Sequence, residues 1–527
     1  MTNLEQHKTN TIFAVKHQKD SGLFSNNLLN TTLLREALTE EINVLLSQLG
    51  SAVIHSVPYD TAWMARLALR YPQQGFDEAI NWLRTHQRKD GSWGSDVLYF
   101  HDRFISTLAA VVALKAVGKT RDIGSIQSAE NYLWQCYLHL HHDMHDTIAF
   151  PVLAVSLMNE ARMLGLDVPR DLYCDVATIE KKLNMVGHTS KKWRHNTMSF
   201  SLEAAQPTYP DMPDFLEGNG SVGTSPAATA SMLIQSPHVH EDSLRYLQDL
   251  VAGQRDGGAP NVAPIDTFEA SWSLNFLRVA GAVSPDHPDV RRLGDLLYNN
   301  WSPERGLGFS SYYSVPNLDD TASSLSVLAW LDYPVTPDSL AWYEEDRYFR
   351  CFPDEVNPSM SAHLRMLTAL RMYPNYHCYD AWIEKIMNTI RRRNLDGQFY
   401  FDKWHSSPYY LRSTGVFSMY GLEDNMVEST IQWMKRSQNN DGGWGYYGQS
   451  TLEETAYCIL ALVFWQKHEG GVDPQILDAG ASYLFENMNR QSLPSLWIGK
   501  CLYTPALVVR SAILAALYSF AAYKDMV

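Results

Sequence analysis

The segments QRKDGSWG (residues 87–94) and QNNDGGWG (residues 438–445) share the pattern Gln-x-x-Asp-Gly-x-Trp-Gly, although they lie in opposite halves of the chain. Each follows a run of apolar residues with helical spacing. Asp-Gly permits a tight turn, the Gln amide can bond free backbone groups at a helix end, and Trp covers the turn with a large apolar surface. Weaker copies occur at 254–260, 302–309 and 394–401. We therefore predict that these Gln and Trp residues are structural.

The segments between the turns have the periodicity of helices. In residues 101–119, Ile105, Leu108 and Val112 share one helical face, and Gly118 supplies a stop. Strand alternation with hairpin turns is scarce. An all-α protein is therefore predicted. Because the helix–turn–helix units occur in both halves, we expect two α/α barrels.

Two segments interrupt the helical pattern and suggest domain boundaries. After a leading helix near 32–49, VPYDTAW (57–63) is the first, and GAVSPDHPDV (281–290) is the second. We place the divisions between the barrels at these two points.

The composition limits the classes of function. The chain has 527 residues and a formal net charge of -15, which disfavours a nucleic-acid partner because phosphate neutralisation needs a basic surface. Its 6 Cys are scattered without a Cys-x-x-Cys pair, so neither a zinc site nor a disulfide framework is indicated. The sequence shows no signal peptide and no membrane span, and we expect a cytoplasmic protein.

The segment SVPNLDDTASS (314–324) carries the most specific chemistry. It places Asp319 and Asp320 behind Asn317, ahead of residues that can open a helix. The two carboxylates could cap that helix, bind a metal ion or hold a proton for catalysis. The residue types alone leave these alternatives open.

An ordered set of segments resembles one enzyme family. DDTA, SVPYDTAW, the two Trp turns, NGSVGTSPAATA (219–230), PIDTFEASW (264–272), DKWHSSPYY (402–410) and LWIGKCLYTPALVVRSAILAAL (496–517) together resemble class II terpene cyclases. The likeness is greatest to short bacterial diterpene cyclases that make copalyl, kolavenyl or halimadienyl diphosphate. It implies a β barrel from 1–55 and 286–527, a γ barrel from 56–285 inserted in it, and an active site between them. The motifs of the α domain that ionises diphosphates are absent from the sequence.

Class II cyclisation begins with protonation of a terminal alkene, which needs a neutral carboxylic acid in a dry site. Asp ordinarily has a pKa of about 3.9, and a second carboxylate nearby raises the pKa of one member of the pair. The resemblance assigns the general acid to Asp319, with Asp320 as a polarising neighbour. Asn317 stands where the family has a first Asp. It can still hydrogen-bond Asp319, but it removes one negative charge, so Asp319 should be protonated less often at rest.

The rest of the predicted site binds the substrate. Aromatic faces can stabilise a migrating cation, and the candidates are Trp301, Phe309, Tyr312, Tyr313, Trp404, Tyr409 and Tyr410. The cations expected to hold the diphosphate are Lys403, Lys500, Lys191, Lys192 and Arg194. The family expectation of Mg²⁺ rests on an acidic motif in the γ domain. In MHDTIAFPVL (144–153), Thr147 stands where Glu is expected, and Asp146 is the substitute ligand that we predict.

The predicted function is conversion of geranylgeranyl diphosphate to a bicyclic diphosphate with the diphosphate retained. Two alternatives stay open at this point. One is a class II cyclase of farnesyl diphosphate, and the other is a non-catalytic or disabled prenyl-diphosphate-binding protein, with Asn317 as the lesion. The expected partners are the prenyl diphosphate and a downstream class I synthase or phosphatase. A homodimer is an alternative to a monomer.

Overall fold

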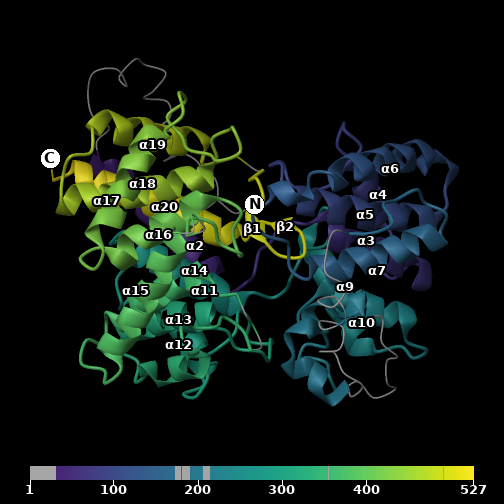
Figure 1. The fold of residues 1–527 in the computed structure, drawn as a ribbon, viewed down its shortest axis with the longest axis horizontal. Coiled ribbons are helices and arrows are strands. Elements are labelled where there is room, and N and C mark those ends of the chain that lie inside the picture. Colours follow the sequence, from purple (N-terminus) through teal and green to yellow (C-terminus); the bar gives the residue numbers. More distant parts are fainter. Residues whose placement is uncertain are drawn as a thin grey trace, which may run out of the picture.

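The chain forms two lobes of helices that lie side by side (Figure 1). The computed structural model describes residues 31–172, 180, 190–205, 214–353, 355, 357–395, 397, 399–490 and 492–526. In this part of the chain, the strands are a single short antiparallel hairpin, β1 (Trp497–Ile498) with β2 (Leu502–Tyr503), beside isolated bridges. The prediction of an all-α protein is confirmed.

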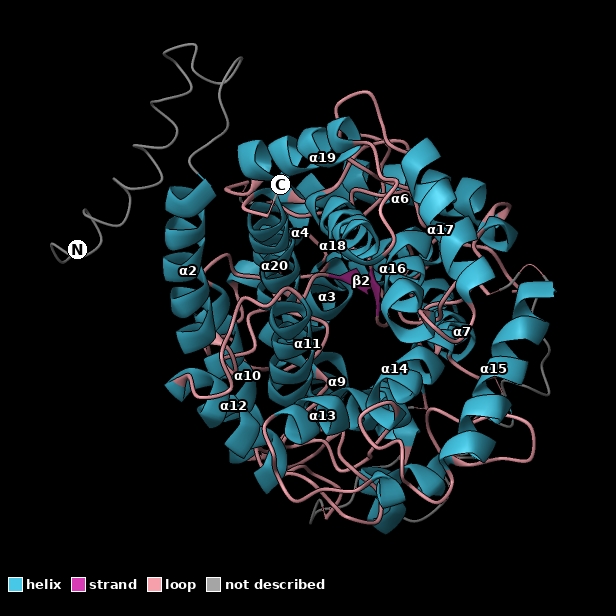
Figure 2. Ribbon diagram, turned by 90° about the vertical axis from the view of Figure 1, so that its left-hand side faces the viewer, coloured by secondary structure: helices cyan, strands magenta, loops and turns pink. Residues whose placement is uncertain are grey.

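The larger lobe is an α/α barrel with an inner and an outer ring. Each inner helix packs on the next, and the last packs back on the first, which closes the ring seen in Figure 2. The inner helices are α11 (Asp266–Val279), α13 (Leu318–Trp330), α14 (Met360–Leu370), α16 (Pro408–Met419), α18 (Leu452–His468) and α20 (Ala506–Lys524). The outer elements are α2 (Thr31–Gln48), α12 (Pro288–Asn299), the 3-10 helix η6 (Pro337–Tyr343), α15 (Tyr379–Leu395), α17 (Asp424–Arg436) and α19 (Pro474–Asn487).

The smaller lobe repeats this plan of an inner ring with elements around it. Its inner ring closes in the order α3, α5, α7, η5, α9 and back to α3. These elements are α3 (Pro58–Arg70), α5 (Phe100–Val117), α7 (Phe150–Met163), η5 (Thr197–Ala204) and α9 (Pro226–Gln235). Around them lie α4 (Glu78–Thr85), α6 (Ile123–Tyr137), α10 (Glu241–Gln254) and the 3-10 helices η2 (Thr120–Asp122), η3 (Leu140–His142) and η4 (Ser190–His195).

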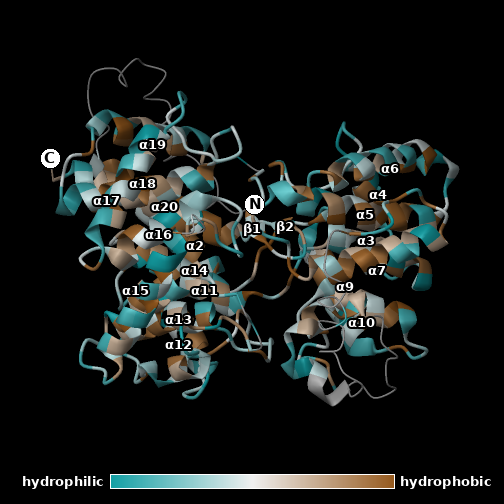
Figure 3. Ribbon diagram, in the orientation of Figure 1, coloured by the Kyte–Doolittle hydropathy of each residue, from teal (hydrophilic) through white to brown (hydrophobic). Residues whose placement is uncertain are grey.

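Sequence patterning separates inner from outer helices. On α13 every residue from Leu318 to Leu328 is buried, because the barrel interior covers one side and outer elements cover the other. On the outer helix α12 the buried residues recur at helical spacing on one face, as expected for a half-exposed helix: Val290, Leu293, Gly294 and Leu297. Figure 3 shows apolar residues gathered on the helices inside both lobes.

The two Trp turns are built alike, one in each barrel. The indole N–H of Trp93 donates to the Leu83 carbonyl, and that of Trp444 donates to the Met434 carbonyl, each at 2.8 Å. Both indoles are fully buried. The turn therefore anchors the end of each outer helix to the barrel core, and the structural role predicted for Trp holds.

The Gln of each turn also bonds beyond its own loop. Gln87 donates to the carbonyls of Gly91 and Ser125, both at 2.9 Å, so it ties the turn to the next outer helix, α6. Gly91 has a φ of 90°, and a Cβ there would lie 2.6 Å from the Ser128 carbonyl oxygen, so only glycine fits. The Gln438 turn bonds α19 in the same way.

The division between the barrels comes earlier in the chain than the sequence indicated. Helix α11 packs on α13 and α20 of the larger barrel, and its apolar residues belong to that barrel's core. The chain therefore returns from the smaller to the larger barrel before Asp266. The interruption at 281–290 is a turn inside the larger barrel. Pro and Gly in that interruption mark the link between α11 and α12, which local sequence cannot distinguish from a domain boundary.

The β1–β2 hairpin connects the two barrels. On the larger barrel, the Ile498 N–H donates to the Trp404 carbonyl at 2.9 Å. On the smaller barrel, Asp102 accepts from the Leu502 N–H at 2.8 Å. The Gly499 carbonyl accepts from the Ile148 N–H, also at 2.8 Å. The hairpin therefore fixes how the facing ends of the two barrels meet.

Helix α20 has the length and apolar composition of a membrane span, the only such helix in the described part of the chain. Of its most apolar stretch of 18 residues, 72% is buried inside the protein. It packs between α18, α11 and α2, so its apolarity is that of a central barrel helix.

Candidate active site

A cavity of about 450 Å³ lies between the two barrels. Its size is within the range of roughly 300–1,000 Å³ usual for ligand pockets. Apolar and aromatic side chains dominate the walls, which come from both barrels and from the hairpin, and Asp319 and Asp320 lie in one wall. The acidic motif thus faces a largely apolar space between the barrels.

Asn317 is the N-cap of α13. Its Oδ1 accepts from the Asp320 backbone N–H at 2.9 Å, and its Nδ2 donates to the Asp320 carboxylate at 2.7 Å. The capping role that the residue types allowed for the aspartates is therefore filled by Asn317, which leaves both carboxyl groups in the first helical turn for other contacts. The side chain of Asn317 bonds Asp320, and not Asp319 as we expected.

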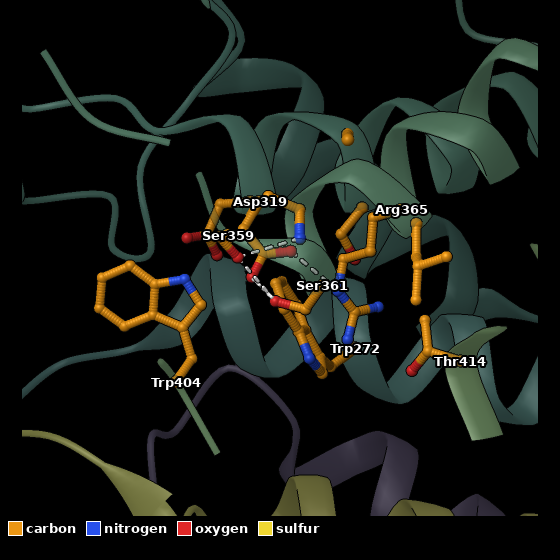
Figure 4. Close-up of polar contacts among 12 residues, drawn as sticks. Trp272, Asp319, Ser359, Ser361, Arg365, Trp404 and Thr414 are labelled. Atoms are coloured by element: carbon orange, nitrogen blue, oxygen red, sulfur yellow. Dashed lines mark hydrogen bonds and ion pairs between the residues drawn. The ribbon is translucent and has the colours of Figure 1, made fainter. Parts of the chain in front are cut away.

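Asp319 is buried and paired with a cation. Its side chain lies against Arg365, whose Nε is 3.0 Å from Oδ1, and Oδ2 accepts from the Ser361 hydroxyl at 3.2 Å (Figure 4). Burial raises the pKa of Asp319 to about 6, although the Arg365 cation opposes this rise. The neighbouring Asp402 raises the pKa further.

Within the residues that the structure describes, the ion pair at this site is made by Asp319 and not by Asp320. One of its oxygens accepts from Asn317, and the other is buried without a hydrogen-bond partner. Burial raises the pKa of Asp320 to about 8, with Asn317 lowering it and Asp319 raising it. The two carboxyl groups titrate as a unit. Because the pKa of Asp320 is the higher of the two, a proton shared by the pair favours Asp320.

Arg365, on α14, is a site residue that the sequence analysis missed. Its guanidinium lies 3.9 Å above the ring of Trp272 and donates through Nη2 to the Tyr410 hydroxyl at 2.5 Å. Trp272 donates to the same hydroxyl at 3.1 Å. The one signal in the sequence is an Arg within a largely apolar helical run.

Asp402 is a second missed residue. It is 3% exposed and accepts from the Ser359 hydroxyl and the Ser361 backbone N–H, both at 3.3 Å. Because Ser361 also bonds Asp319, the serine links the two carboxylates. In Figure 4, Ser359 and Ser361 lie close to Asp319, with Trp404 to one side and Arg365 to the other.

The aromatic candidates divide into two groups. Phe309, Tyr313 and Trp404 line the cavity, and the first two are stacked with ring centroids 4.3 Å apart. The others do not line it: Trp301 and Tyr409 pack in or against the larger core, Tyr312 is 43% exposed, and Tyr410 lies behind the wall, bonded to Arg365.

Further aromatic side chains that line the cavity were not predicted individually: Phe200, Phe268, Trp272, Phe352, Trp497 and Tyr503. Several lie within the segments 264–272 and 496–517 that carried the family resemblance. Which aromatic residue of such a segment faces the cavity depends on packing between the barrels.

The predicted diphosphate ligands lie in different places. Lys500 is fully buried, where it donates to Glu203 and the Ser225 hydroxyl, both at 2.6 Å, and it does not line the cavity. A diphosphate role does not fit this placement, because the ammonium is already neutralised inside the smaller barrel. Arg194 is paired with Glu217 at 2.9 Å. The side chains of Lys191 and Lys192 lie outside the described residues.

Lys403 lines the cavity and is paired with Glu355. Its charge lowers the pKa of Asp319, which places it near the acid. The terminal alkene and the diphosphate are opposite ends of a prenyl diphosphate. The position of Lys403 therefore favours a role beside the acid over a role in binding the diphosphate.

Asp146 does not belong to a ready-made metal site. It lies 3.2 Å from His101 Nε2, and Asp143 lies 2.8 Å from His101 Nδ1. Burial lowers the pKa of His101. The hydrogen bonds and negative charges of Asp143 and Asp146 raise it by more, so the pKa of His101 is raised overall. No group of three or more His, Cys, Asp or Glu suited to a metal ion occurs in the described part of the chain. These residues therefore do not fit a preformed Mg²⁺ site.

Two closed α/α barrels with a buried aspartate pair in an apolar cavity between them define the class II terpene cyclase architecture. The solved structure of ent-copalyl diphosphate synthase from Streptomyces platensis matches with a TM-score of 0.75 and 27% identity, over 92% of this chain and 99% of that chain. None of the protein-family models searched matches the chain.

The sequence comparison gives the family. The chain is 33% identical to the type B diterpene cyclase of Mycobacterium tuberculosis over 485 residues, which is 88% of this chain and 95% of the relative. It is 30% identical to the ent-copalyl diphosphate synthase of a Streptomyces species over 524 residues, 93% of this chain and 97% of the relative. The chain belongs to the class II terpene cyclase family, and these relatives are diterpene cyclases.

Proposed function

We propose that this protein is a diterpene cyclase that converts geranylgeranyl diphosphate to a bicyclic diphosphate of the copalyl, kolavenyl or halimadienyl type. The observation that carries the proposal is the aspartate pair Asp319–Asp320, which is buried in the wall of a largely apolar cavity, where burial raises the pKa of both carboxyl groups. The C20 substrate is supported by the diterpene names of the relatives.

The first step transfers the carboxyl proton to the terminal alkene. The acid O–H bond breaks and its electron pair stays on the carboxylate. The π electron pair of the alkene forms a new C–H bond at the CH carbon of the terminal double bond, which leaves a tertiary cation at the dimethyl-substituted terminal carbon. Aromatic faces such as those of Trp272 and Phe309 stabilise the cation without adding to it. The diphosphate takes no part in this step and is retained.

Mg²⁺ dependence belongs to the same proposal, although the described carboxylates form no preformed site for the ion. The retained diphosphate also defines the next reaction class. An enzyme that ionises or hydrolyses a diphosphate, either a class I synthase or a phosphatase, must consume the product.

The test is incubation with geranylgeranyl diphosphate and Mg²⁺, followed by dephosphorylation and GC–MS. A bicyclic alcohol supports the proposal, whereas recovery of geranylgeraniol alone, with substrate binding intact, would identify a non-catalytic binding protein. A parallel incubation with farnesyl diphosphate decides the chain length, because a sesquiterpene cyclase would favour that substrate. A sample with EDTA tests the Mg²⁺ requirement.

A further inference from the structure

Arg365 is a buried cation whose ion pair, within the described residues, is with Asp319. Its side chain is 10% exposed, so water screens little of its charge. A buried charge is stable only when it is paired and hydrogen-bonded. The arginine is therefore part of the electrostatics of the acid, and not a surface charge near it.

Aromatic groups hold the guanidinium in place. It stacks 3.9 Å above Trp272, and the Tyr410 hydroxyl accepts from Nη2. Tyr410 is in turn fixed by the Trp272 indole N–H and by stacking on His405, with ring centroids 4.6 Å apart. The cation thus stays beside Asp319 whichever protonation state the pair adopts.

The charge balance changes when the proton leaves. At rest, one shared proton gives the pair a single negative charge, which the Arg365 cation offsets. After transfer to the alkene, both carboxylates are ionised in a site of low polarity. Asn317 contributes no charge to the pair. The negative charge added by the second ionisation is therefore offset by Arg365, which is in direct contact with Asp319.

We propose that Arg365 is a positioning residue that sets the acid strength of the Asp319–Asp320 pair by stabilising the doubly ionised state formed on proton transfer. This inference rests on the proposed cyclase function. The opposite charge comes from α14, which packs beside α13 in the inner ring of the larger barrel.

Other charged and titratable groups also face the pair, and the experiment keeps them constant. They are Tyr410 on α16, Asp402 and Lys403 in the segment before α16, Tyr343 of η6, Cys351 and Glu355 in the segment after η6, and Tyr503 of β2. Among them Asp402 raises the pKa of Asp319 and Lys403 lowers it. The predicted shift is therefore measured by changing Arg365 alone.

The direction of the effect follows from the sign of the charge. An opposite charge in contact lowers a carboxyl pKa by roughly 1 to 3 units, so replacing Arg365 with a neutral residue should raise the pKa of the pair by a similar amount. Turnover needs the proton and is lost as pH rises through that pKa. The alkaline limb of the pH–rate profile should move upward. The plateau rate should fall because the acid is weaker, with KM nearly unchanged.

The experiment compares Arg365→Gln, Arg365→Lys and Arg278→Gln with the parent enzyme. Arg278 is the matched control, because it is a partly buried arginine on the inner helix α11 that bonds Asn275 and lines, with Arg365, a small cavity away from the acid pair. We expect an upward shift of the alkaline limb for Arg365→Gln, partial return with Arg365→Lys, and no shift for Arg278→Gln. An unshifted limb in Arg365→Gln, or an equal shift in Arg278→Gln, overturns the proposal.

A second measurement needs no turnover. Infrared difference spectra of the substrate-free protein, assigned with Asp319→Asn and Asp320→Asn, report the protonated carboxyl band as pH changes. Arg365→Gln should move the midpoint of that band upward by about 1 unit or more. An unchanged midpoint overturns the role of Arg365. A shifted midpoint in a protein that makes no cyclised product supports that role and contradicts the cyclase function instead.

Discussion

Asn317 bonds Asp320 twice, once through Oδ1 to the backbone N–H at 2.9 Å and once through Nδ2 to the carboxylate at 2.7 Å. One side chain thus begins helix α13 and orients one member of the acid pair. Asp319 is left to Arg365 and Ser361. The two carboxyl groups therefore have different partners, and their substitution should have different consequences.

Replacing Asp319 with Asn or Ala should reduce turnover by at least about 10³-fold, as expected for loss of an essential acid–base group. Substrate binding should be largely retained, because the cavity walls are unchanged. The measurement is single-turnover product formation by GC–MS, together with a binding titration. Near-normal turnover would remove Asp319 from the acid pair.

Replacing Asn317 with Asp should keep the helix cap, since Asp caps as well as Asn. It also removes an N–H donor and adds a negative charge beside Asp320. Both changes make the pair a weaker acid, so we expect a lower plateau rate and an alkaline limb at higher pH. A large gain in rate would show instead that Asn317 impairs the enzyme.

The raised pKa of Asp320, about 8, predicts how the stability of the protein depends on pH. The unfolded chain loses this proton near pH 4, whereas the folded chain keeps it to about pH 8. Between these values the folded state binds more protons, so this group costs increasing stability as pH rises through the window. Asp320→Asn removes the cost.

Thermal unfolding at several pH values tests this prediction. The Tm of Asp320→Asn, relative to the parent, should rise from pH 5 to about pH 8 and then level off. Asp242→Asn is the control, because that side chain is 77% exposed. A constant difference across this range would contradict burial as the cause of the raised pKa.

Replacing Lys500 with Met should destabilise the fold and leave KM for the substrate nearly unchanged in the folded protein. Lys500 is fully buried and neutralises Glu203 at 2.6 Å, and breaking such a pair costs about 3–5 kcal/mol. Chemical denaturation measures the loss, and adding Glu203→Gln should recover part of it. A large rise in KM without destabilisation would favour the diphosphate role instead.

Local sequence determined the features whose interactions lie within a few residues or repeat along the chain. The Trp turns were predictable because Asp-Gly and the indole act within one loop and the helix before it, as Trp93 and Leu83 show. The helices followed from the spacing of apolar residues. Asn317, Asp319 and Asp320 were recognisable as a motif because they are adjacent.

Tertiary structure decided the electrostatics and the walls of the site. Arg365 meets Asp319 only because α13 and α14 pack side by side, and Lys500 meets Glu203 only because the hairpin enters the smaller barrel. A carboxyl pKa depends on burial and on charges brought from distant segments, which no local pattern records. The sequence therefore identified the acid pair, while packing between helices and between barrels determined its proton affinity and the surface that the substrate meets.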